Sequence, residues 1–243
     1  MKQDSKIYKK MVANAIGDAK QYADVNYDGE NPCVLVDKVD EGLSVIDATE
    51  APFEHCYTLR KPSAMSLDWL KSRMVATPSA VTLGVDTDAV AKWLHKNLEK
   101  FFYCTLERII FVGGGDDAAD DQDFDYLYFL DNDIASSLEE HSLPGSNMLG
   151  ISWITANTAV VHVGNVIRTT KEMVEDGDLY DWEESDVVNE GVAVSVVHEL
   201  RHLAQNNPYI PEESFRQISA DPETDAEQFA RNFFDKHPAQ IMR

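Results

Sequence analysis

The chain is poor in cysteine, in long apolar runs and in positive charge. Its three cysteines, Cys33, Cys56 and Cys104, stand far apart in 243 residues, and neither their odd number nor their spacing suits a disulfide framework or a zinc knuckle. No apolar run reaches the roughly 18 residues of a membrane span. Residues 1–21 lack the continuous apolar core of a secretory signal. We therefore expect a cytoplasmic protein with reduced thiols and no membrane partner.

Basic residues are outnumbered two to one. The 21 Lys and Arg against 43 Asp and Glu give a formal net charge of -22, which opposes binding to nucleic acids and to anionic membranes. The acids concentrate in residues 116–140 and 172–190. We interpret both blocks as solvated loops. The alternative is an acidic rim that attracts a basic substrate or a metal ion.

Apolar periodicity predicts an α+β protein. An N-terminal helix and an antiparallel meander are expected over residues 5–24, 33–38, 43–48 and 55–60. Further strands are expected over residues 106–112, 124–130, 150–155 and 159–164. Further helices are expected over residues 87–102, 186–205 and 221–235. Pro, Gly and Ser in residues 76–87 indicate a boundary. We therefore expect an N-terminal α+β region of unknown role, 1–82, and a second domain, 83–243.

The stretch "VVHELRHLAQ" (196–205) carries the chemistry. His198 and His202, four apart on a helix, lie on one face, where their ring nitrogens can converge on one zinc ion. Glu199 lies beside the pair and can deprotonate a zinc-bound water without being a ligand. The same motif also arises by chance, and the alternative is a buried histidine pair with satisfied hydrogen bonds.

A catalytic zinc site needs a third protein ligand. The extension H-E-x-x-H-x-x-G-x-x-H fails, because Gln205 and Pro208 occupy its last two defined positions. On the next predicted helix, within "DPETDAEQFARNFF" (221–234), Glu223 can complete a His-His-Glu site from the first turn, where negative charge is favoured. Glu227, one turn later, can accept the free N–H of a ligand histidine. Asp225 points away from this face.

"HELRH" followed by E-x-D-A-x-x-F-A resembles the gluzincin zinc metallopeptidases, and in compactness the small intracellular ImmA/IrrE-type members. The resemblance implies a zincin-like fold for the second domain, with His198, His202 and Glu223 as zinc ligands and Glu199 as general base. It implies that "TAVVHV" (158–163) is the edge strand that aligns an extended peptide. The residues of that strand are Val160, Val161 and His162. Glu227 stands where the family pattern often has Asp or Asn.

The family also uses a His or Tyr to stabilise the oxyanion. Tyr209 is our candidate for this catalytic role, and the alternatives are His162, Tyr180 and His237. The function expected is a zinc-dependent metallopeptidase, a hydrolase acting on a peptide or protein substrate that is basic if the acidic surface selects it. One alternative is a catalytically inactive zincin-like protein that binds a basic partner through its acidic surface. Another is a metal-dependent hydrolase of a different substrate class.

Overall fold

The computed structural model describes residues 2–21, 34–48, 55–113, 149–154, 156–176 and 184–243. The strand expected over 124–130, the acidic block 116–140 and Tyr180 lie outside these residues, as does part of the second acidic block.

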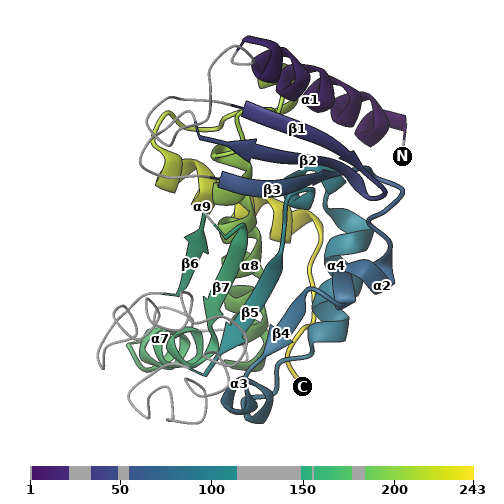
Figure 1. Cartoon of the computed structure of the whole chain (residues 1–243). Coiled ribbons are helices and arrows are strands. Elements are labelled where there is room, and N and C mark those ends of the chain that lie inside the picture. Colours follow the sequence, from purple (N-terminus) through teal and green to yellow (C-terminus); the bar gives the residue numbers. More distant parts are fainter. Residues whose placement is uncertain (1, 22–33, 49–54, 114–148, 155, 177–183) are drawn as a thin grey trace.

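The N-terminal residues form a helix over a three-stranded sheet (Figure 1). Helix α1 (Lys2–Gln21) is followed by β1 (Val34–Val39), β2 (Gly42–Asp47) and β3 (His55–Arg60), which pair antiparallel in the order β1-β2-β3. Apolar residues of α1 share a buried core with those of the strands: Ile7, Met11, Ala15, Val34, Val45 and Leu59. The predicted meander is confirmed, because the alternation of apolar and polar residues fixes which face is buried.

The second sheet has four strands in the order β4-β5-β7-β6. These are β4 (Met74–Ala76), β5 (Arg108–Val112), β7 (Thr158–His162) and β6 (Gly150–Trp153). The pairs β4/β5 and β5/β7 are parallel, whereas β6 runs antiparallel to β7 and forms one edge among the described strands. Between β4 and β5 lie α3 (Pro78–Thr82), α4 (Thr87–Asn97) and η1 (Lys100–Tyr103), and α2 (Leu67–Lys71) precedes β4.

The predicted boundary after residue 82 falls between two helices, but the packing is continuous across it. Strand β4 precedes the boundary and yet pairs with β5, which follows it. Buried residues from both sides of the boundary form one apolar cluster. The N-terminal region therefore contributes a strand to the sheet that carries the site.

Three helices complete the described chain. Helix α7 (Val163–Glu175) follows β7 directly, α8 (Glu184–Gln205) lies against β6 and β7, and α9 (Pro222–Lys236) packs on α8 (Figure 1). A short 3-10 turn, η2 (Glu212–Ser214), lies between α8 and α9. The expected core face of α8 is buried as predicted: Val188, Val192, Val196, Leu200 and Leu203. Helix α7 was not predicted from the sequence, because its buried positions Val163, Val166 and Thr170 directly continue the apolar run of a strand.

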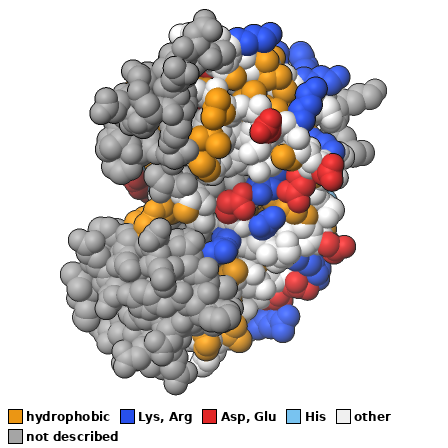
Figure 2. Space-filling model, in the orientation of Figure 1, with side chains coloured by type: hydrophobic (Ala, Val, Ile, Leu, Met, Phe, Trp, Pro, Cys, Tyr) orange, Lys and Arg blue, Asp and Glu red, His pale blue; other side chains and the backbone are white. Residues whose placement is uncertain are grey.

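Some large apolar side chains are exposed at the surface. Figure 2 shows apolar side chains gathered over β1 and β2, in agreement with the exposure of Leu35 and Val39. No helix of the described chain combines the length and the apolarity that crossing a membrane requires. The observed mixture of helices and two sheets agrees with the predicted α+β class.

Candidate metal centre

His198, His202 and Glu223 come together where α8 meets the first turn of α9. The two Nε2 atoms of the histidines are 3.0 Å apart. Glu223 directs Oε1 to His198 at 3.0 Å and Oε2 to His202 at 3.1 Å. The expected trio thus lies in mutual contact, and one ligand atom from each residue lies within 4.8 Å of the others.

These separations suit a zinc ion. Ligand atoms about 2.0–2.1 Å from a tetrahedral metal are roughly 3.3 Å from one another, close to the 3.0–3.1 Å between the atoms of the trio. Two imidazole nitrogens and a carboxylate are a donor set that zinc favours. Burial and the neighbouring His202 lower the pKa of His198, against the opposing effect of Glu223 and Glu227. The lowered pKa favours the neutral imidazole that metal binding requires.

Glu199 lies beside the trio and is held from β6. Ser152 Oγ donates to Glu199 Oε2 at 2.6 Å and also lies 2.8 Å from the carbonyl oxygen of Glu199. A Cβ atom at Gly150 would come 2.5 Å from Glu199 Oε1, so the carboxylate lies directly over this glycine. Burial raises the pKa of Glu199 to about 7, although the Ser152 hydrogen bond and His202 act to lower it. A carboxylate in this environment is suited to accept and return a proton near neutral pH.

The expected edge strand is an inner strand. Val160, Val161 and His162 belong to β7, which is buried between β5 and β6. The prediction that residues 158–163 form the edge strand is therefore wrong. The pattern of apolar residues along a strand does not reveal which strands pair on either side of it. Among the described strands, the edge on the side of the metal centre is β6.

The phase of the β6/β7 ladder directs some backbone groups of β6 away from β7. The amide of His162 donates to the carbonyl of Leu149, and in an antiparallel ladder the hydrogen-bonded pairs then recur at every second residue. Ile151 and Trp153 are hydrogen-bonded to β7, whereas the N–H and C=O groups of Gly150 and Ser152 point to the other side. Within the described residues, no strand pairs with that side of β6.

Gln205, and not Glu227, contacts the second ring nitrogen of the candidate ligand His202. Glu227 Oε1 accepts a hydrogen bond from Arg231 Nε at 3.2 Å on the exposed side of α9. The Nδ1 atom of His202 lies 2.7 Å from Oε1 of Gln205. Gln205 thus occupies the supporting position behind His202 that was predicted for Glu227. In the sequence Gln205 stands out only as a mismatch to another motif, although a residue three positions after His202 on a helix lies beside it.

Asp225 is fully buried and ties α8 to α9, in keeping with its exclusion as a ligand. Its Oδ2 atom accepts from Arg201 Nε at 2.7 Å and from Gln205 Nε2 at 2.9 Å. Its Oδ1 atom accepts from the amide of Ile218 at 2.5 Å. Burial acts to raise the pKa of Asp225, but the hydrogen bonds from Arg201, Ile218 and Gln205 outweigh it and lower the pKa to about 2. The Arg201 guanidinium also lies 3.7 Å from the ring centre of Phe215.

Three candidates for oxyanion stabilisation are described, and no hydrogen bond or ring contact joins any of them to the trio. Tyr209 is fully buried, and its hydroxyl donates to Asp47 at 2.9 Å, so its prediction as a catalytic residue is not met. His162 is 1% exposed on the inner strand, where burial lowers its pKa to about 4. His237 ends α9, and its ring packs on Phe233.

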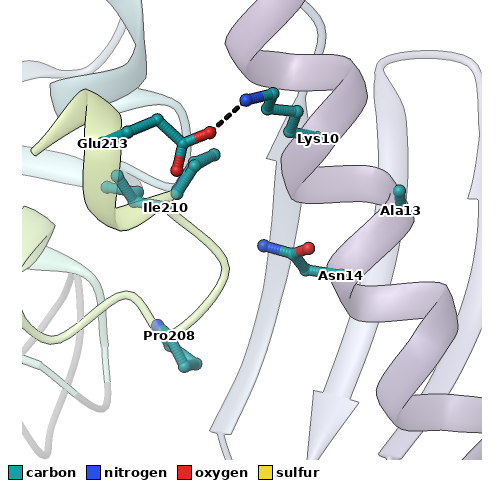
Figure 3. A pocket seen from close by; sticks show the side chains of 7 residues that line it. Lys10, Ala13, Asn14, Pro208, Ile210 and Glu213 are labelled. Atoms are coloured by element: carbon teal, nitrogen blue, oxygen red, sulfur yellow. Dashed lines mark hydrogen bonds and ion pairs between the residues drawn. The ribbon is translucent and has the colours of Figure 1, made fainter.

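A separate cavity of about 520 Å³ lies between α1 and the segment that follows α8. Figure 3 shows Lys10 and Glu213 joined by an ion pair at this cavity, with Asn14 beside them. None of its lining residues belongs to the His-His-Glu trio. The His-His-Glu trio therefore lies apart from this cavity, at the α8/α9 junction.

Comparison of the chain with protein-family models, with curated proteins and with solved structures gives no match. The site is therefore interpreted from its own geometry.

Proposed function

We propose that this protein is a zinc-dependent metallopeptidase. The observation that carries the proposal is the convergence of His198, His202 and Glu223 on one point, with the carboxylate of Glu199 beside them. Three lone-pair donors that face one another at 3.0–3.1 Å repel unless a proton or a metal cation lies among them. Zinc in such a site supplies Lewis acidity toward a carbonyl oxygen and lowers the pKa of a water molecule.

Glu199 is the proposed general base. Because Ser152 occupies Oε2, the Oε1 atom remains to accept a proton from the attacking water. The water oxygen bonds to the carbonyl carbon, the C–N bond breaks, and Glu199 returns the proton to the leaving nitrogen. Ser152 and Gly150 orient the carboxylate for this transfer, one through its hydroxyl and the other through the absence of a side chain.

Strand β6 is the proposed substrate-aligning element. An extended peptide can pair with the N–H and C=O groups of Gly150 and Ser152 and so extend the sheet by one strand. The Cβ position of Gly150 and the hydroxyl of Ser152 both face Glu199. A peptide on this edge therefore runs next to the general base, as hydrolysis of one of its bonds requires.

The test is hydrolysis of a peptide library by the zinc-loaded protein and by its Glu199→Gln variant. We expect the variant to bind zinc as the wild type does and to lose at least about 100-fold in cleavage rate, the lower range for general acid–base catalysis. Equal cleavage rates would contradict the mechanism.

A second candidate is a zincin-like protein without catalytic activity that binds a basic partner. It is favoured by the positions of Tyr209, His162 and His237, none of which contacts the trio within the described residues. Binding of a basic partner that survives His198→Ala, together with no cleavage of any library peptide, would support this alternative over the first.

A further inference from the structure

Gln205 is fixed in one orientation by its neighbours. Its Nε2 atom donates to the carbonyl oxygen of Pro222 at 2.9 Å and to Asp225 Oδ2 at 2.9 Å. Both partners are acceptors, since a proline carbonyl has no hydrogen and the Asp225 carboxylate is paired with Arg201. The amide nitrogen of Gln205 must therefore face α9, and its Oε1 atom must face His202.

This orientation determines the tautomer of His202. Because Oε1 of Gln205 is an acceptor, the Nδ1 atom of His202, 2.7 Å away, must carry the hydrogen. In the neutral ring the lone pair then lies on Nε2, which faces His198 and Glu223. The hydrogen-bond chain from Arg201 through Asp225 and Gln205 thus ends on a histidine prepared to bind a metal.

The same contacts set the distance between the two helices that carry the trio. Pro222 and Asp225, on which Gln205 is anchored, flank Glu223 in the first turn of α9. Asp225 is 0% exposed and Arg201 is 1% exposed, so this end of the anchor is enclosed in the protein, whereas the contact with Pro222 is exposed. Gln205 therefore acts on both His202 and the placement of Glu223.

We propose that Gln205 is a positioning residue of the metal centre, which selects the Nδ1–H tautomer of His202 and couples it to the buried Arg201–Asp225 pair. The inference deepens the proposed function and rests on it for its effect on zinc. Its effect on the tautomer of His202 does not depend on any metal. The positioning role of Gln205 and the proposed metallopeptidase function can therefore fail separately.

The experiment compares wild type with Gln205→Met, which keeps the length of the side chain and removes both hydrogen-bonding groups. The matched control is Gln228→Met, the same change at an exposed position of α9. Histidine tautomers are measured in the metal-free proteins by nitrogen-15 NMR at mildly alkaline pH. Zinc affinity is measured by competition with a chromophoric chelator, and folding is checked by thermal unfolding.

We expect His202 to be the Nδ1–H tautomer in wild type and in Gln228→Met. In Gln205→Met we expect a shift toward the Nε2–H tautomer, which can donate to Glu223, and zinc affinity about 10- to 100-fold weaker. An unchanged tautomer with unchanged zinc affinity would overturn the proposal. If wild type binds no zinc but the tautomer still responds to Gln205→Met, the positioning role stands and the metallopeptidase function fails.

If Gln205→Met does not fold, the tautomer of His202 in Gln205→Glu tests the proposal instead. It retains an acceptor for His202 but places a carboxylate beside Asp225. We expect the Nδ1–H tautomer to persist in this variant. Its loss would contradict the role given to Oε1.

Discussion

Gly150 on β6 lies against the carboxylate of Glu199 on α8, so closely that a methyl group at position 150 would come 2.5 Å from Oε1. We predict that Gly150→Ala displaces Glu199 and lowers peptide hydrolysis at least about 10-fold, because a general base misplaced by about an ångström loses much of its effect. Zinc binding should be retained. Steady-state kinetics and zinc titration of the same sample check this.

Gly17→Ala is the control for this substitution. Gly17 lies within α1 and has no atom within 4 Å of the added methyl position. The change should raise the free energy of unfolding by about 0.5–1 kcal/mol and leave hydrolysis unchanged. Full activity of Gly150→Ala would show that the packing of Gly150 does not place the base.

The side of β6 that faces away from β7 predicts an alternating effect of N-methylation in a peptide substrate. Backbone groups of a paired strand point toward β6 at every second residue, where Gly150 and Ser152 offer their N–H and C=O groups. Methylation at alternate amides should therefore raise KM about 10-fold or more, roughly the value of one hydrogen bond, and methylation between them should have little effect. Kinetics of a singly N-methylated peptide series would reveal this period of two. A flat response would exclude strand addition at β6.

The buried pair of Arg201 and Asp225 predicts a large loss of stability when one partner is removed. Asp225→Ala leaves a buried guanidinium without its carboxylate and should cost about 3–5 kcal/mol in the free energy of unfolding. Urea denaturation provides the measurement.

Glu227→Ala on the same helix is the control, because its ion pair with Arg231 is exposed. That change should cost no more than about 1 kcal/mol. Similar losses for the two variants would indicate that Asp225 does not anchor the junction of α8 and α9.

The sequence predicted the parts of the structure that depend on local pattern. Histidines four apart must share a helix face, and the acidic residue that opens the next helix was identified from its position, so His198, His202 and Glu223 were found together. The meander over β1–β3 followed from alternation and turn residues. These features need only a few neighbouring residues to be specified.

Features that depend on long-range neighbours were missed or misassigned. Strand β7 is apolar, and its sequence alone does not distinguish an inner strand from an edge strand. Its pairing with both β5 and β6 shows that it is an inner strand. Tyr209 lies close to the motif in sequence, but its hydroxyl turns to Asp47 across 162 positions of sequence. Gln205 acquires its role only when α9 brings Pro222 and Asp225 beside it.

Zinc content by plasma mass spectrometry tests the central claim most directly. The protein is purified without a histidine tag, alongside Glu223→Gln and Glu227→Gln, which remove one negative charge each from the same helix. The account predicts about one zinc per chain in wild type and in Glu227→Gln, and loss of most of it in Glu223→Gln. Absence of zinc from wild type even after zinc is added back, or equal zinc in all three proteins, would contradict the His198–His202–Glu223 site.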